Sequence, residues 1–288
     1  MTMIEDRART EGSPDGAVAL ADEVATAAEH ALDPRPSADA VPPAATLPPA
    51  VAVRRGRAAI WVAIAGVLGF SAILAVVRAG RSQSLDILLM RRLQAHQEPL
   101  VRRVMHAASW PGFPPQSRLI APIAIAGLWL ARLRLEALML AGGWGTALVS
   151  TVVKAGIRRP RPVADGVLRV VAGRLGGSSF PSGHVITYMG VYGSMAYLAQ
   201  TLIRPRSVRR ATVAGLLGLL AAVGPSRVHA GHHWPTDVTA SYLLGTSYLI
   251  GLTELYRRIK ARRAGVAADL GPPPLPVSPS TGGPDLPG

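Results

Sequence analysis

The sequence predicts an all-α membrane protein, a bundle of six transmembrane helices between two disordered tails. Apolar stretches of roughly 17–20 residues, the length that crosses a bilayer, recur through the middle of the chain. Hydrophobic residues make up 49% of the 288 residues, and the mean hydropathy is positive at +0.28. Most arginines flank the apolar stretches, where membrane proteins usually place them.

The chain divides into three parts. Residues 1–50 are acidic, rich in proline and poor in apolar surface, so this tail is expected to be disordered. Residues 51–263 are expected to form the membrane domain, and residues 264–288 a second disordered, proline-rich tail. The spans are expected at residues 58–77, 119–131, 135–153, 185–203, 211–225 and 238–256. The second span has only about 13 apolar residues, so neighbouring helices must bury it.

Residues 84–108, between the first two spans, are predicted to form one amphipathic helix that lies in the plane of the membrane interface. Its two faces carry the leucines Leu85, Leu88, Leu89 and Leu93 and the arginines Arg91, Arg92, Arg102 and Arg103. Glycine pairs within three of the spans would let helices approach closely inside the bundle. These pairs are Gly66/Gly69, Gly190/Gly193 and Gly215/Gly218. General richness in alanine and glycine is the alternative explanation for them.

The charge distribution narrows the choice of partners. The formal net charge is +14, yet residues 51–263 alone hold 28 basic and six acidic residues. Such a basic domain suits nucleic acid, an anionic membrane surface or an anionic substrate. No arginine-rich stripe with interleaved aromatics lies on a water-facing helix, so no nucleic-acid partner is expected. The absence of cysteine excludes disulfides, thiol catalysis and cysteine-based zinc sites.

The basic residues also bear on orientation. With both termini in the cytoplasm, and the N-terminal tail left out, each side of the membrane receives 14 basic residues. By the positive-inside rule, basic residues in short loops mark the cytoplasmic side, and those in long loops weigh less. The tight arginine clusters at residues 54–57, 204–210 and 257–263 are therefore placed in the cytoplasm. The protein is therefore expected in the cell membrane as a multi-pass protein, with its active site on the extracytoplasmic face.

Three polar clusters adjoin the predicted spans, namely residues 154–162, 181–184 and 226–237. The first two share one loop. The fourth and fifth spans form a hairpin that returns the third cluster to the same side. A charged group at the bilayer centre costs on the order of 2.5–3.5 kcal/mol, so such clusters at the membrane boundary suggest a charged ligand.

The residue types in these clusters fit phosphate. Lys154, Arg161 and Arg227 supply fixed positive charge, and the planar fork of arginine matches phosphate oxygens. Ser182 and Gly183 lie at a helix start, where free backbone N–H groups favour an anion. Any single basic residue here could instead be an anchor flanking a span, and Pro-Ser-Gly-His alone could be a turn and helix cap.

Two histidines and a carboxylate complete the set. His233 and Asp237 are spaced i, i+4 at the start of the sixth span, so Asp237 can hold one ring nitrogen of His233 and leave the other free to attack. His184 can act as an acid toward the leaving oxygen. A zinc or iron site is the alternative, formed by His229, His232, His233 and Asp237. The three nearby cations and the lack of a further carboxylate or thiol ligand argue against a metal.

The pattern Lys-x6-Arg-Pro, Pro-Ser-Gly-His and Ser-Arg-x5-His-x3-Asp resembles that of the type 2 phosphatidic acid phosphatase (PAP2) superfamily, in its membrane-embedded branch. All three motifs match without departure over about residues 154–237. The resemblance implies a phosphohistidine mechanism that needs no Mg²⁺ and no other cofactor. It makes His233 the nucleophile, Asp237 its partner and His184 the general acid. It assigns the phosphate-binding roles to Lys154, Arg161, Ser182, Gly183 and Arg227, and it selects Arg161 over Arg159 and His233 over His232.

The expected activity is hydrolysis of lipid phosphate monoesters or diphosphates, such as a polyprenyl diphosphate, phosphatidate, diacylglycerol diphosphate or phosphatidylglycerophosphate. One alternative is a phosphotransferase on the same scaffold, which passes the group to an alcohol instead of water. Another is a non-catalytic lipid-phosphate binder or transporter. His184, His233 and Asp237 argue against the binder, because affinity alone requires only the cations.

Overall fold

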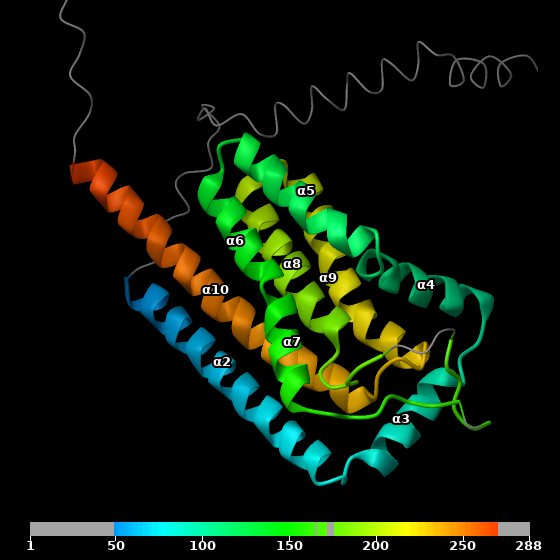
Figure 1. Ribbon diagram of the computed structural model, residues 1–288. Coiled ribbons are helices and arrows are strands. Elements are labelled where there is room, and N and C mark those ends of the chain that lie inside the picture. The colour runs from blue at the N-terminus through cyan, green and yellow to red at the C-terminus, as the bar shows by residue number, and fades with distance from the viewer. Residues whose placement is uncertain (1–48, 165, 172–175, 270–288) are drawn as a thin grey trace, which may run out of the picture.

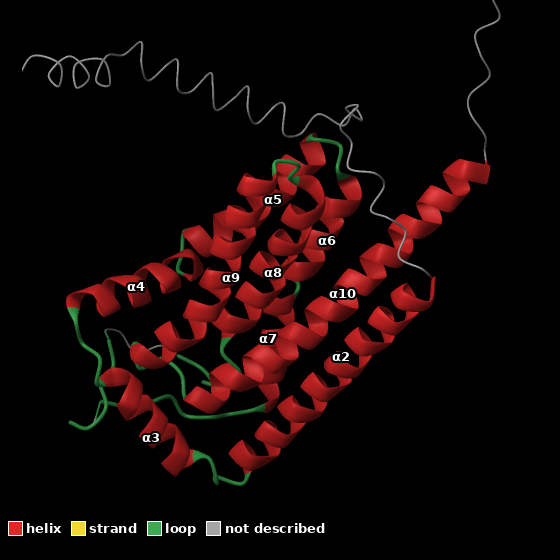
Figure 2. Ribbon diagram, turned by 180° about the vertical axis from the view of Figure 1, so that it is seen from behind, coloured by secondary structure: helices red, strands yellow, loops and turns green. Residues whose placement is uncertain are grey.

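The computed structural model describes residues 49–164, 166–171 and 176–269. Within these ranges every regular element is a helix (Figures 1 and 2). The helices are α2 (Pro49–Arg78), α3 (Gln83–Gln94), α4 (Pro99–Ser109), the 3-10 turn η1 (Trp110–Gly112), α5 (Gln116–Leu130), α6 (Arg134–Trp144), α7 (Thr146–Gly156), α8 (Gly183–Leu202), α9 (Arg206–His229) and α10 (Pro235–Asp269). The predicted disorder of the two tails concerns residues that lie almost wholly outside the described ranges. The predicted C-terminal boundary at residue 263 falls inside α10.

Among the described residues, three helical segments are long and apolar enough to cross a membrane: Ala58–Arg78, Arg134–Gly156 and Arg206–His229. Gln116–Leu130 is apolar but shorter, as the sequence indicated. The lipid-facing character is clearest on α2, where Trp61 is 69% exposed and Leu68 64% exposed. Large apolar side chains that face outward in this number suit a bilayer rather than water. The prediction of an all-helical membrane protein is therefore confirmed.

Helix α8 is the central helix of the bundle. It packs against α6, α7, α9 and α10, while α2 lies along α10 on the outside (Figures 1 and 2). Because most of α8 is covered by protein, it can carry tyrosine, serine and glycine in place of a continuous apolar surface.

Two of the three predicted glycine pairs lie at helix contacts. A Cβ on Gly66 would lie 2.2 Å from Ser247 Oγ on α10, and one on Gly190 would lie 2.0 Å from the carbonyl oxygen of Gly143 on α6. Side chains at these positions would force the helices apart. In the third pair, on α9, a Cβ on either glycine would meet no described atom within 4 Å. This pair makes no close helix contact, and the general richness of the chain in alanine and glycine accounts for it.

The prediction of one helix over residues 84–108 is wrong, because the segment forms two helices, α3 and α4. Pro99 starts α4, and proline disfavours a helical conformation in the residue before it. The leucine-rich face of α3 also points outward, with Leu85 52% exposed, whereas Asp86 and Met90 are fully buried. The third span is likewise interrupted, at Gly145 between α6 and α7.

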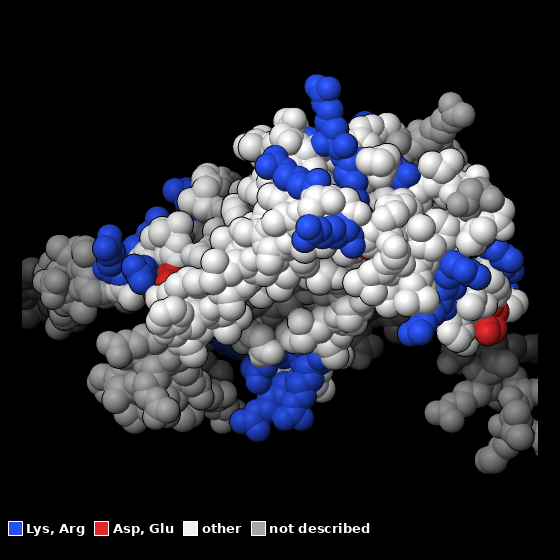
Figure 3. Space-filling view, turned by 90° about the horizontal axis from the view of Figure 1, so that it is seen from below, with Lys and Arg blue, Asp and Glu red and all other residues white. Residues whose placement is uncertain are grey.

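One end of the bundle gathers the C-terminal ends of α7 and α9, the N-terminal ends of α8 and α10, and the loops that join them, with α3 close by (Figure 1). Two of these loops cross where Val171 N donates to the Ala230 carbonyl at 2.9 Å. Gly231 makes the crossing possible: its φ is +76°, and a Cβ there would lie 2.2 Å from the Arg169 carbonyl oxygen. Figure 3, viewed from this end, shows many Lys and Arg atoms and few Asp and Glu atoms.

Candidate active site

The structure brings the three polar clusters of the sequence together at this end of the bundle. Lys154 Nζ, from α7, donates to the Ser178 carbonyl at 2.8 Å. Arg161 donates to the His232 carbonyl, also at 2.8 Å, and so ties the first cluster to the third. The second cluster joins through Ser182, whose backbone N–H donates to Ser241 Oγ of α10 at 2.7 Å. The predicted site residues therefore share one face of the molecule.

Three cations surround the site without a carboxylate partner. Among the described residues, no carboxylate oxygen lies within 4 Å of Lys154, Arg161 or Arg227. Arg227 is only 1% exposed and stacks over the ring of Phe113 at 5.1 Å. Burial lowers the pKa of Arg161 below its ordinary value, and the charge of Asp237 opposes that shift. One buried and two half-buried cations without a counterion indicate an anionic ligand.

Several buried polar atoms of the site have no hydrogen-bond partner within the described part of the chain. They are Arg161 Nε, Ser182 Oγ, His184 Nε2 and Arg227 Nε. A buried donor left unpaired costs about 1–3 kcal/mol, so folded proteins seldom leave several in one place. Gly183 begins α8 with Ser182 as the preceding cap residue, and the free N–H groups of this helix start add further donors. The oxygens of a phosphate group would satisfy such a set.

His233 is held by a backbone carbonyl. Its Nδ1 lies 2.8 Å from the Ser179 oxygen and 3.7 Å from Asp237 Oδ2. Because a carbonyl only accepts, the proton of the neutral ring sits on Nδ1. Nε2 therefore keeps its lone pair, with Arg161 as a distant neighbour at 3.4 Å. Burial lowers the pKa of His233 to about 4, against the opposing effect of Asp237, so the ring is neutral at pH 7.

The neighbouring histidines are both engaged elsewhere. His232 Nδ1 contacts Arg227, and its Nε2 faces the Val171 carbonyl at 2.9 Å. His229 Nε2 faces the His96 carbonyl at 3.0 Å. In the described part of the chain, no three His, Cys, Asp or Glu side chains converge as a metal site would require. The four residues considered as a zinc or iron site thus point toward separate partners.

A buried charge network supports Asp237, and sequence reasoning missed it. Arg159 bridges two fully buried carboxylates, with NH1 at 2.5 Å from Asp237 Oδ1 and NH2 at 2.6 Å from Asp86 Oδ2. Asp86 also accepts from the backbone N–H and the hydroxyl of Thr236, and Arg159 NH2 donates to Ser82 Oγ. Arg159 is therefore occupied, whereas Arg161 lies beside His233. A signal existed: Asp86 is one of only six acids in residues 51–263, and it stands in a leucine-rich helix.

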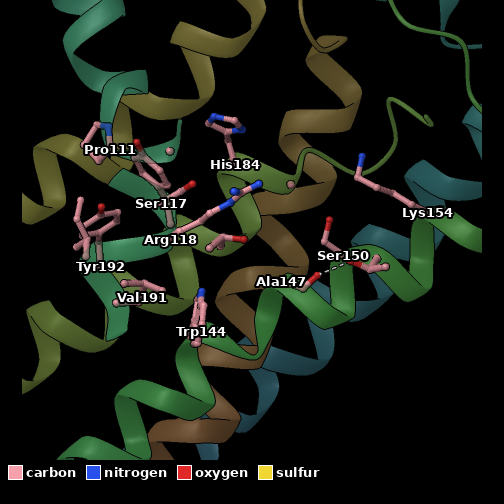
Figure 4. Close-up of a pocket in the computed structure, with 17 residues that line it drawn as sticks. Pro111, Ser117, Arg118, Trp144, Ala147, Ser150, Lys154, His184, Val191 and Tyr192 are labelled. Carbon is pink, nitrogen blue, oxygen red and sulfur yellow. Dashed lines mark hydrogen bonds between the residues drawn. The ribbon is translucent and has the colours of Figure 1, made fainter. Parts of the chain in front are cut away.

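His184 projects from the first turn of α8 into a cavity of about 410 Å³ between α5, α7 and α8 (Figure 4). Its ring meets Phe113 edge-on at 5.1 Å. Gly112 lies directly against it, because a Cβ there would be 2.3 Å from His184 Cδ2. Lys154 and Gly183 line the same cavity. The cavity is of the size that binds small ligands.

Comparison with known proteins agrees with this arrangement. The model of the PAP2 superfamily matches residues 129–261, which include all three motifs. Phosphatidylglycerophosphatase B of Bacillus subtilis (strain 168) is 28% identical over 183 residues, 62% of this chain and 86% of that protein. The crystal structure of a transmembrane PAP2-type phosphatidylglycerolphosphate phosphatase from Bacillus subtilis shares the fold, with a TM-score of 0.61 at 23% identity, over 69% of this chain and 98% of that one.

Proposed function

Because residues 129–261 belong to the PAP2 superfamily and the protein is a phosphatase, we propose that it hydrolyses lipid phosphate monoesters or diphosphates through a phosphohistidine intermediate. The observation that carries this proposal is the set of unpartnered buried donors around His184 and His233. The phosphatidylglycerophosphatase named among the relatives makes phosphatidylglycerophosphate the first substrate to test.

The geometry supports two balanced steps. His233 Nε2 attacks phosphorus, the bond from phosphorus to the lipid oxygen breaks, and that oxygen takes a proton from His184. In the second step a water oxygen bonds to phosphorus, the bond to His233 breaks, and His184 recovers a proton from the water. The Ser179 carbonyl and Asp237 stabilise the positive ring while the phosphate is attached.

The proposed phosphate cradle consists of Lys154, Arg161, Ser182, Gly183 and Arg227. Fixed donors aimed at the developing charge stabilise the transition state without reorganisation. The three cations of the cradle also supply the charge that Mg²⁺ supplies in other phosphoryl-transfer enzymes. We therefore assign no metal or other cofactor to the reaction.

The experiment is phosphate release from a panel of lipid phosphates by the purified protein, with and without EDTA. Full activity is expected in EDTA, and inhibition by vanadate, which resembles five-coordinate phosphorus. Loss of activity on chelation, with rescue by a divalent ion, would overturn the metal-independent mechanism. Added glycerol tests the phosphotransferase alternative, because a transferase would form glycerol phosphate in place of free phosphate. Binding of the lipids without turnover would support the binder instead.

Replacing Gly112 with alanine should lower turnover by about a hundredfold, which is typical when a catalytic group is displaced by about 1 Å. The new Cβ would overlap the His184 ring, so the proton donor must move. Steady-state kcat on a lipid phosphate measures this. Gly127→Ala is the matched control, because no described atom lies within 4 Å of a Cβ at that position. Equal kcat values for the two variants would contradict the placement of His184.

The proposed topology has six crossings, formed by α2, α5, α6 with α7, α8, α9 and α10, with the active site on the extracytoplasmic face of the cell membrane. The arginine clusters and the apolar helices support it. Under this topology, the loop with Val163 lies outside the cell and the loop with Ser207 inside.

Single cysteines test the topology without background, because the native chain has none. Val163 is 70% exposed, and Ser207 is exposed at the start of α9. A membrane-impermeant maleimide on whole cells should label Val163→Cys and spare Ser207→Cys, while permeabilised cells should show both labelled. The reverse pattern in whole cells would place the active site in the cytoplasm. Equal labelling would mean that the α8–α9 hairpin does not cross the membrane.

A further inference from the structure

The cavity next to His184 extends beyond the proposed phosphate cradle. Lys154, Gly183 and His184 form part of its wall, and the remainder comes largely from apolar side chains of α5, α7 and α8, such as Ile120 and Val191. A phosphate held by the cradle would therefore have the rest of the cavity available for the part of the substrate that follows it.

Arg118 is a fourth cation at this cavity, on an exposed position of α5. It stands in the first turn of α5 and lines the cavity, and Figure 4 shows its side chain extending into the space between His184 and Ser150. Among the described residues, no carboxylate oxygen lies within 4 Å of its guanidinium. It belongs to none of the three sequence motifs. A guanidinium without a counterion beside an apolar wall suits an anionic group.

Ser150 supplies an independent observation. It lies one helical turn before Lys154 on α7, is 3% exposed, and its Oγ has no hydrogen-bond partner among the residues that the structure describes. The same hydroxyl lies 3.5 Å from the position that a Cβ on Gly183 would occupy, so it borders the cradle. Ser150 also lines the cavity, and a buried hydroxyl without a partner beside a cavity indicates a polar ligand group near that point.

We infer that Arg118 and Ser150 form a second phosphate subsite, and that the preferred substrates carry a second phosphate between the scissile phosphate and the lipid tail. This inference rests on the proposed function. Lys154, Arg161 and Arg227 supply three positive charges to the scissile phosphate in the proposed cradle, so we assign the fourth cation of this cavity to a second phosphate, which phosphatidate lacks. A lipid diphosphate and a phosphatidylglycerophosphate both place a second phosphate there.

The test compares kcat/KM for two matched pairs of substrates. Phosphatidylglycerophosphate is paired with phosphatidate of the same acyl chains, and farnesyl diphosphate with farnesyl phosphate. Arg118→Gln should lower kcat/KM for the two-phosphate member by about tenfold to a hundredfold, as expected for the loss of a charge-assisted hydrogen bond. The one-phosphate member should change by less than about threefold. Arg118→Lys should recover part of the loss.

Arg92→Gln is the matched control, because Arg92 is exposed on α3 and lines none of the cavities described. An effect confined to the first pair identifies a phosphodiester as the second group, and one confined to the second pair identifies a diphosphate. Equal losses for both members of each pair, or no loss in either, would overturn the subsite. The proposed function would stand in that case, because it depends only on hydrolysis by the wild-type protein. If the wild-type protein hydrolyses none of the four lipids, the proposed function fails and the subsite fails with it.

Discussion

His233→Ala should abolish turnover, with a loss of at least about 10⁴-fold in kcat, the scale on which removal of a nucleophile or its base acts in other hydrolases. The structure gives the reason. His233 Nε2 keeps its lone pair, because the Ser179 carbonyl fixes the proton on Nδ1. In His232, by contrast, both ring nitrogens have close partners, Arg227 and the Val171 carbonyl. Alanine removes both the attacking nitrogen and the atom that would carry the phosphate.

The measurement combines phosphate release with quenching in alkaline SDS after mixing with ³²P-labelled lipid phosphate. The wild-type protein should retain label that later acid treatment removes, and the variant should retain none. His96→Gln is the control, because the His96 side chain is exposed in the loop before α4, and it should behave as the wild type. Label on the His233→Ala variant, or label mapped to His232 in the wild type, would remove His233 from the nucleophile's role.

Arg159→Met should lower the free energy of unfolding by about 3–5 kcal/mol, the cost of breaking a buried ion pair by removing one partner. Methionine roughly matches the apolar part of the side chain but leaves Asp86 and Asp237 buried without their shared cation. kcat should also fall, because Asp237 lies 3.7 Å from His233 Nδ1 and would lose its fixed position.

Arg158→Met is the matched control for this change, because the adjacent arginine is exposed. Denaturant unfolding of both variants in the same detergent measures the difference. Arg159→Lys should restore only part of the stability, since a single ammonium group cannot present separate nitrogens to two carboxylates as the guanidinium does. If Arg158→Met and Arg159→Met unfold alike, the bridge contributes nothing to stability.

The sequence was sufficient for the parts of the site that depend on chain order and residue type. Lys154, Arg161 and Arg227 meet on one face because the α8–α9 hairpin returns the chain to the side where α7 ended. That conclusion needs no knowledge of which helices touch. Likewise, His233 and Asp237 sit one helical turn apart, so their proximity follows from spacing alone.

The parts that sequence reasoning missed depend on contacts between distant segments. Asp86 and Arg159 are 73 residues apart, and their pairing requires α3 to lie against the loop after α7. Hydrophobic periodicity could not orient α3, because lipid and protein interior are both apolar surroundings, and its leucines face outward. The partner of His233 is a backbone carbonyl, which every residue carries, so side-chain types give no sign of it.

The unpartnered donors of the cradle have a thermodynamic consequence for the whole protein. A fold that keeps Arg161 Nε, Ser182 Oγ and Arg227 Nε buried without acceptors among the described residues is less stable than one in which these atoms are bonded. Any anion that satisfies them binds the native state and not the unfolded chain, so its concentration shifts the folding equilibrium by mass action. A phosphate-bearing ligand therefore acts as part of the folded structure, and the complex withstands heat and detergent better than the protein alone.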